Sequence, residues 1–314
     1  VHYELEAGAG RKRRVRYSLG TTALDRARVL RDAIFAAWSD PPELLSDARI
    51  EVADHDGLTL RCAAPDPARA RRLARIDRGN VMVELPATLQ GIEALEILTT
   101  DGVSSTITHI FSIAVFERVA QAYIAGLEKF FATHSVWRTA PTAVASFSLA
   151  PIDAAVDERL VDLDHADLTR KTGIAMARVL YARFEEIFSG PRWKRLAARD
   201  ARVLRPKWTR IEPLEEGQAE TFYADALIGP QTVLTFTLPT LDAFLDQGTP
   251  ALTILDDLPA AEAHLAELES LDFDLEELQE DLLESHLAES DRQYQSLVQS
   301  VVRKLFVDIP DSTG

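Results

Sequence analysis

Short apolar runs alternate with longer amphipathic stretches through most of the chain. Runs rich in β-branched residues predict strands at residues 50–53, 81–85, 105–111, 142–147, 205–211 and 232–236. Apolar residues that recur every three or four positions predict helices at 66–76, 91–99, 115–131, 153–162, 169–188 and from 239 or 240 onward. This repetition is typical of parallel strands joined by helical crossovers.

The two ends of the chain differ from this repeat. Residues 1–20 predict two short strands joined by a glycine turn at 7–10, and residues 22–38 predict an amphipathic helix. With that strand pair, six strands become eight, the number in a closed (β/α)8 barrel. Residues 258–306 predict two acidic helices, whose apolar stripe we expect to pack within the chain, with a partner chain as the alternative. We therefore expect residues 1–314 to form one α/β domain.

Charge and composition narrow the classes of partner. The formal net charge is −16, and residues 251–314 hold 16 acidic against 3 basic side chains, which disfavours binding to a nucleic-acid backbone. We expect a cytoplasmic protein, because the sequence shows neither a signal-peptide pattern nor a run of about 18 apolar residues that could cross a membrane. The single cysteine, Cys62, excludes an internal disulfide and a cysteine-based zinc cluster.

One predicted strand carries a charge that needs an explanation. The run Val81-Met82-Val83-Glu84-Leu85-Pro86 indicates a strand buried on both faces and ended by a proline. A carboxylate in such a strand is costly unless it is paired or has a chemical role. Glu84 is therefore the first candidate functional residue.

Several segments, in the same order, resemble successive landmarks of bacterial transaldolases. They are residues 48–52, 80–88, 107–112, 123–128, 144–147, 188–193, 205–208 and 240–244. The resemblance runs from about residue 25 to about residue 305. It implies a transaldolase-like (β/α)8 TIM barrel, here with an altered N-terminal strand pair and a helical C-terminal extension.

The resemblance also implies a lysine at position 84, where this chain has Glu84. In the family that lysine forms an imine with a ketose, and a carboxylate cannot replace an amine in this step. Of the six lysines, only Lys207 lies on a predicted core strand. The resemblance places Trp208, Arg210 and Glu212 inward, so alternation along the strand predicts that Lys207 points outward.

Other family positions are partly kept. Glu51, Thr108 and Ser146 are retained, whereas an asparagine becomes Thr106 and the arginine that holds the sugar phosphate becomes Pro151. On the seventh family strand a serine becomes Arg210 and a basic position becomes Glu212. We expect Thr106, Thr108, Ser146, Arg210 and Glu212 to contact a substrate.

Two carboxylates suggest chemistry without an imine. We expect Glu51 and Glu84 to lie on adjacent strands and point into the barrel mouth, where one carboxyl group could keep a proton and act as acid while the other acts as base. The structural alternative is that Glu84 pairs with Arg210 across the barrel. A weaker alternative is a divalent cation held by Glu51, Glu84, His109 and Glu212, although His109 should face away if Thr108 faces inward.

These observations lead to three hypotheses of function. The first is a repurposed barrel that binds a small carbonyl or sugar-like metabolite and acts by paired carboxylates, with no metal and no cofactor. The second is a non-catalytic homologue that serves as a scaffold or partner-binding subunit, in a homo- or hetero-oligomer formed through its acidic C-terminal helices. The third is residual transaldolase activity, a transferase reaction of carbohydrate metabolism.

Overall fold

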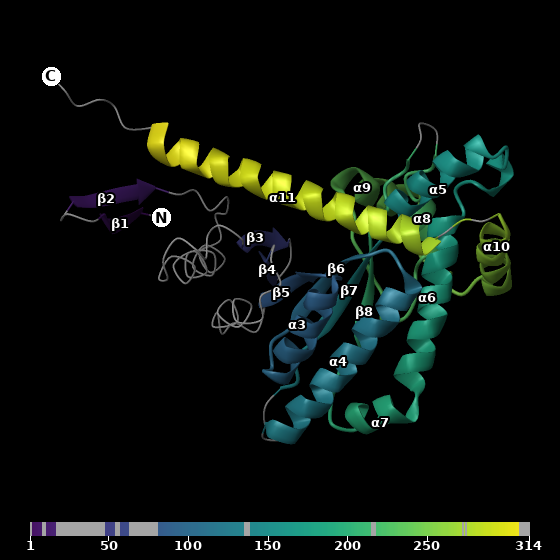
Figure 1. Ribbon diagram of the computed structural model, residues 1–314, viewed down its shortest axis with the longest axis horizontal. Coiled ribbons are helices and arrows are strands. Elements are labelled where there is room, and N and C mark those ends of the chain that lie inside the picture. Colours follow the sequence, from purple (N-terminus) through teal and green to yellow (C-terminus); the bar gives the residue numbers. More distant parts are fainter. Residues whose placement is uncertain are drawn as a thin grey trace.

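A single sheet of seven strands organises the molecule (Figure 1). The computed structural model describes residues 2–7, 11–16, 48–53, 57–62, 81–134, 139–214, 218–271, 273 and 275–307. The strand order is β3-β4-β5-β6-β7-β8-β9, and every pair from β4 onward is parallel. The strands are β3 (Ala48–Ala53), β4 (Gly57–Cys62), β5 (Val81–Pro86), β6 (Ser105–Ile110), β7 (Ala143–Ser148), β8 (Arg205–Thr209) and β9 (Val233–Leu234).

The helices follow the strands as the apolar spacing predicted. They are α3 (Leu89–Thr100), α4 (Ile113–Thr133), α5 (Ala150–Asp162), α6 (Thr172–Ser189), α9 (Leu238–Gln247), α10 (Leu258–Ser270) and α11 (Leu275–Val307). Two shorter helices, α7 (Pro191–Ala197) and α8 (Phe222–Ala226), and a 3₁₀ turn at Ala166–Leu168 were not predicted. Three helix starts have side-chain caps, because the hydroxyls of Thr88, Ser112 and Thr237 accept hydrogen bonds from backbone N–H groups one turn later.

The N-terminal strands correct one prediction. The hairpin of β1 (His2–Ala7) and β2 (Arg11–Arg16) is present, but it forms a two-stranded sheet of its own. The count of eight strands assumed that this hairpin joins the main sheet, and it does not. The sheet instead contains β4, which the sequence pattern missed and which pairs with β3 as an antiparallel hairpin. The helices predicted at 22–38 and 66–76 lie outside the described residues.

The apolar core lies between the sheet and its covering helices. Val83, Leu85, Ile107, Phe147 and Trp208 are all at most 2% exposed. Helices α3 and α4 are in close contact with each other and lie against β5, β6 and β7. This core fixes which face of each strand is turned toward the helices, and therefore which face is left for a site.

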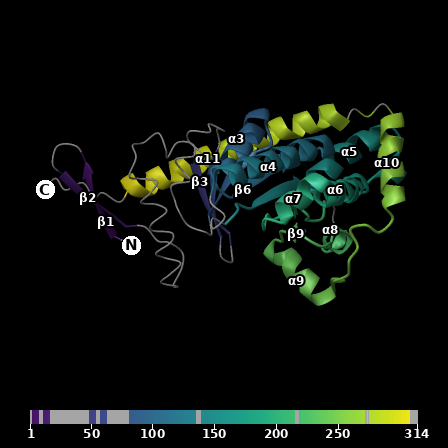
Figure 2. The same cartoon turned by 90° about the horizontal axis from the view of Figure 1, so that it is seen from below.

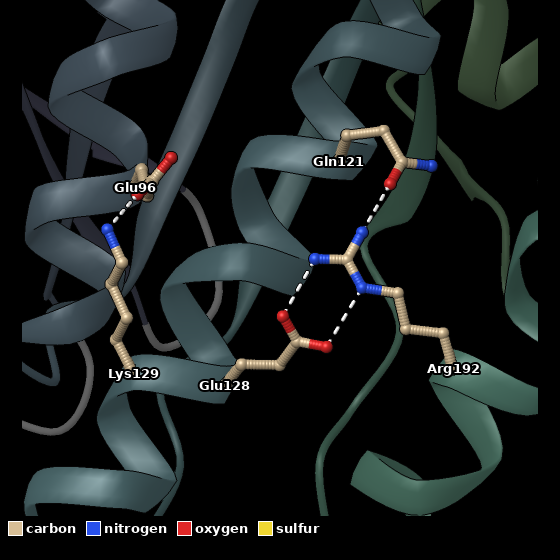
Figure 3. A network of polar contacts seen from close by, with 5 residues as sticks. All are labelled: Glu96, Gln121, Glu128, Lys129 and Arg192. Atoms are coloured by element: carbon tan, nitrogen blue, oxygen red, sulfur yellow. Dashed lines mark hydrogen bonds and ion pairs between the residues drawn. The ribbon is translucent and has the colours of Figure 1, made fainter.

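Polar contacts hold α7 against α4 on the outside of the fold (Figure 3). The Arg192 guanidinium donates to both carboxylate oxygens of Glu128, at 2.8 and 2.7 Å, and to Gln121 Oε1 at 2.6 Å. The hydrogen bonds from Arg192 lower the pKa of Glu128. Both partners are about 40% exposed, so solvent screening limits this pair to about 1 kcal/mol or less.

Candidate functional site

A polar face of the sheet lies opposite the helix-covered face. Side chains alternate along a strand, and residues paired across parallel strands share a face. Glu84 pairs with Thr106, and Thr106 with Val144. Ser146, two residues after Val144, lies on the same face and pairs with Lys207. We call this surface, with Glu84, Thr106, Ser146 and Lys207, the inner face.

The inner face is buried and polar. Glu84 is 7% exposed, Thr106 5% and Ser146 3%. Thr106 Oγ1 donates to Met82 Sδ at 3.7 Å, and Thr108 Oγ1 donates to the Leu85 carbonyl at 3.4 Å. Within the described part of the chain, Ser146 Oγ is buried and has no hydrogen-bond partner. A buried hydroxyl without a partner is uncommon in proteins, and a ligand atom can satisfy it.

The orientation of β8 reverses a prediction. Phe147 pairs with Trp208, and their rings meet edge to face at 6.2 Å. Trp208 is fully buried in the helix-side core, so the neighbouring Lys207 points to the inner face, where it is half-buried. The prediction that Trp208 faces inward and Lys207 outward is wrong. An amine therefore lies on the same face as Glu84.

Helix α11 is in contact with β6 and runs past the carboxyl ends of the strands (Figure 1). Arg210, just after β8, forms an ion pair with Glu289 of α11 at 3.6 Å. His109 Nε2 lies 3.5 Å from Ser290 Oγ, and its ring lies 5.9 Å from that of His286. The first apolar residues of the predicted stripe, Leu275, Leu278, Leu282 and Leu283, pack against the core of the chain, as predicted, and the helix brings polar side chains to these strand ends.

A β-bulge explains the position of His109. The pairing of β6 with β7 shifts register between Ile107 and Ile110, and His109 has a φ of 60°, an uncommon value for a residue with a side chain. The bulge breaks the simple alternation after Thr108. The prediction that His109 faces away from the barrel interior stays a prediction, and its ring reaches α11.

His286 is the buried group of this contact. It is 9% exposed, and its ring lies 5.1 Å from that of Phe111. Burial lowers the pKa of His286, the positive charge of Arg210 lowers it further, and Glu289 opposes both effects. The imidazole is therefore uncharged at neutral pH, which suits its packing against an aromatic ring.

The remaining predicted site residues are not all brought together. Glu51 lies on β3 and pairs with Thr59 on β4, so β4 separates it from the strand of Glu84. The prediction that the two carboxylates lie on adjacent strands is wrong, and a role for Glu51 stays a prediction. Glu212 is half-buried just beyond β8. Arg210 has Glu289 as a partner, and a pair between Glu84 and Arg210 stays a prediction.

The described residues also bear on metal binding and membrane insertion. Among the residues that the structure describes, no three His, Cys, Asp or Glu side chains are grouped so that they could hold a metal ion. No helix in that same part of the chain is both long and apolar enough to cross a membrane.

Known proteins resemble this chain over most of its length. The sequence model of a family described as Transaldolase/Fructose-6-phosphate aldolase matches residues 66–301. The chain belongs to the transaldolase/fructose-6-phosphate aldolase family. This membership confirms the predicted fold class, a transaldolase-like (β/α)8 barrel, and within the described residues β3 and β9 form the two edges of its sheet.

Three relatives named Transaldolase illustrate the similarity within the transaldolase/fructose-6-phosphate aldolase family. The protein of Neisseria gonorrhoeae is 34% identical over 270 residues, which are 85% of this chain and 71% of the relative. The Thermobifida fusca protein is 34% identical over 73% of this chain and 63% of its own length. The Parafrankia protein is 38% identical over 65% of this chain and 56% of its own length. The chain thus spans less than two thirds of the last two relatives.

Proposed function

We propose that this chain binds a small carbonyl or sugar-like metabolite on the inner face of its barrel, and that Glu84 transfers a proton there. The observation that carries this is the burial of Glu84, Thr106 and Ser146 on one face, with the Ser146 hydroxyl unpaired within the described part of the chain. A hydroxylated ligand offers the hydrogen-bonding atoms that such a face lacks. A carboxyl group that is 7% exposed is also suited to acid–base work.

The family supports the class of ligand and of reaction. The relatives are named Transaldolase, which favours a transfer reaction on sugar-like carbonyl compounds as the more specific form of this proposal. The imine chemistry of the family needs an amine at position 84, where this chain has Glu84. The original pairing of Glu84 with Glu51 no longer supports the proposal, because β4 lies between their strands. We therefore assign the proton transfer to Glu84 alone.

A binding experiment tests the proposal. Dihydroxyacetone, fructose and fructose 6-phosphate are titrated into the protein by calorimetry, and the exchange of their α-hydrogens with D₂O is followed by NMR. We expect at least one compound to bind and to exchange faster than in buffer. Glu84→Gln, which keeps the shape of the side chain, should slow the exchange at least tenfold. Glu96→Gln, on the outer surface where Glu96 pairs with Lys129, should leave it unchanged.

A second candidate is a non-catalytic homologue that binds a partner. The observation that favours it is α11, whose Glu289 and His286 occupy the ends of β8 and β6. If none of the three compounds binds, or if Glu84→Gln and Glu96→Gln behave alike, the acid–base proposal is wrong and this second candidate replaces it.

A further inference from the structure

One turn of α11 contacts the ends of two strands. His286, Glu289 and Ser290 are spaced three and four residues apart, so they share one face of the helix. Glu289 forms an ion pair with Arg210 just after β8, and Ser290 and His286 lie beside His109 near the end of β6. We call His286–Ser290 the contact turn. It belongs to a helix of 33 residues that runs along the length of the molecule (Figures 1 and 2).

Both strand ends have an unusual backbone where they meet the contact turn. His109 has a φ of 60° and Arg210 a φ of 50°, in the left-handed region that residues with a side chain disfavour. Such residues keep this conformation where surrounding contacts hold them, and they are enriched at clamps and switches. Both residues contact the same turn of one helix. Release of α11 would therefore free both strand ends to relax.

The charges around His286 make this contact sensitive to a proton. Its ring is 9% exposed and lies against Phe111. The groups that face it are the His109 ring, the Arg210 guanidinium and the Glu289 carboxylate of its own helix. Glu289 is already paired with Arg210. A proton on His286 would therefore bury a second cation beside Arg210 with one shared carboxylate, which is unfavourable in a buried position.

Other charged groups near α11 lie elsewhere on the helix. Helix α5 also contacts α11, but its Arg159 lies over Phe273, just before α11 begins. The acidic side chains of Glu280, Asp281 and Glu284 are exposed on α11. The response to a proton therefore centres on the contact turn.

We propose that the contact turn is an acid-sensitive latch. It holds α11 over the ends of β6 and β8 while His286 is neutral, and it releases the helix when His286 takes up a proton. Parallel barrels bind ligands at the carboxyl ends of their strands, so the latch sets whether this end is covered. The latch acts whether or not the proposed carbonyl compound binds.

The pH at which the latch opens follows from the lowered pKa of His286. Burial lowers this pKa most, Arg210 lowers it further, and Glu289 opposes both effects. The closed form therefore has its full stability above pH 6.5, the ordinary pKa of a histidine side chain, and loses stability as the pH falls below 6.5.

Hydrogen–deuterium exchange of the full-length chain at pH 7.5 and pH 5.5 tests the latch, with exchange times scaled for the intrinsic effect of pH. A helix released from the fold loses protection, because tertiary packing supplies most of its stability. We expect the protection of residues 284–292 to fall about threefold to tenfold, where about tenfold is the limit set by one pH unit below 6.5. Helix α4, measured in the same sample, is the reference and should not change.

Substitutions of two histidines locate the proton. His286→Phe keeps an aromatic ring against Phe111 and cannot be protonated, so the protection of α11 should be equal at both pH values. His286→Gln is a second variant that cannot be protonated, and it should behave in the same way. His264→Gln is the matched control, because His264 is buried on α10, has a lowered pKa and bonds to Thr172 Oγ1 at 3.0 Å. This control should respond to pH as the native protein does.

A substitution in the ion pair tests the closed form itself. Glu289→Gln removes the pair with Arg210 and should lower the protection of residues 284–292 at pH 7.5. Glu280→Gln, at an exposed position of the same helix, should leave it unchanged. Circular dichroism of each variant confirms that it is folded before its exchange is compared.

Three results would overturn the latch. The first is equal protection of residues 284–292 at both pH values in the native protein, or an equal loss in α4. The second is a native pH response in both His286 variants, and the third is its disappearance in His264→Gln. None of these measurements uses a carbonyl compound, so the latch and the proposed function stand or fall separately.

Discussion

Removing one hydroxyl group should make the stability of this protein more dependent on pH. Tyr223 Oη donates to Asp153 Oδ2 at 2.6 Å, and the Gly173 N–H donates to Asp153 Oδ1 at 2.7 Å. Asp153 is fully buried, and burial raises its pKa from 3.8 to about 6, although the bond from Tyr223 opposes this rise. The contact links α5 with α8, so Tyr223→Phe tests the packing of both helices.

The direction in which stability changes with pH follows from the raised pKa of Asp153. Because the folded protein holds the Asp153 proton more tightly than the unfolded chain, the stability that this carboxyl group contributes is present below about pH 4. That contribution is lost as the pH rises through about 6. Tyr223→Phe removes a donor to the ionised form and raises the pKa of Asp153 further. Between pH 5 and pH 8 the variant should therefore lose more stability than the native protein.

The size of the expected loss in unfolding free energy follows from the type of hydrogen bond that Tyr223 makes with Asp153. A hydrogen bond to a charged group contributes about 1.5–3 kcal/mol, and a neutral one about 1 kcal/mol. We expect Tyr223→Phe to lower the free energy of unfolding by about 2–3 kcal/mol at pH 8, where Asp153 is ionised. At pH 5, where Asp153 is mostly protonated, the loss should be about 1 kcal/mol. Other groups, including His264, titrate in both proteins and cancel in the difference.

Urea unfolding followed by tryptophan fluorescence at pH 5 and pH 8 measures these free energies. Tyr123→Phe is the matched control, because Tyr123 is fully buried and its hydroxyl bonds to backbone groups, among them the carbonyl oxygens of Pro141 at 3.0 Å and Arg202 at 2.9 Å, and not to a carboxylate. Its loss should be about 1 kcal/mol at both pH values. An equal loss for Tyr223→Phe at pH 5 and pH 8 would refute the reasoning about Asp153.

Two further substitutions test the packing. Trp208→Ala should cost about 3–5 kcal/mol of unfolding free energy, because Trp208 is fully buried against Phe147. Lys207→Met should cost under about 1 kcal/mol. Equal losses of the two variants in urea unfolding would contradict this assignment of the faces of β8. Gly126→Ala should cost about 1–3 kcal/mol, because the new Cβ would lie 2.6 Å from Thr99 Cβ, which outweighs a gain in helix propensity of about 1 kcal/mol. Gly190→Ala, whose Cβ has only ordinary contacts, should be nearly neutral in the same measurement.

Periodicity located the helices and most strands, since each buries a regular stripe or face. It missed β4 because the sequence Gly57–Cys62 follows closely on β3 and carries an arginine, so it does not stand out as an apolar run. The face of β8 was misjudged because the resemblance was carried over strand by strand. The register of Phe147 with Trp208, which decides the face, is a long-range contact that local spacing does not encode.

Parts of the candidate site were predictable to different degrees. The inward Glu84, Thr106 and Ser146 follow from simple alternation along regular strands. His109 could not be placed in this way, because its positive φ and the register shift between Ile107 and Ile110 break the alternation at that point of the strand. Its contact with His286, 177 positions later in the chain, depends on where α11 packs.

If a small molecule binds the inner face as proposed, α11 lies on its route from the carboxyl ends of the strands. Its side chains contact His109 near the end of β6 and Arg210 just after β8, so a ligand arriving from that end would meet the helix first. Entry would then require a displacement of the helix, and association would be slower than diffusion alone. In that case, breaking the ion pair between Arg210 and Glu289 would speed association and dissociation together, so the helix would govern residence time rather than affinity.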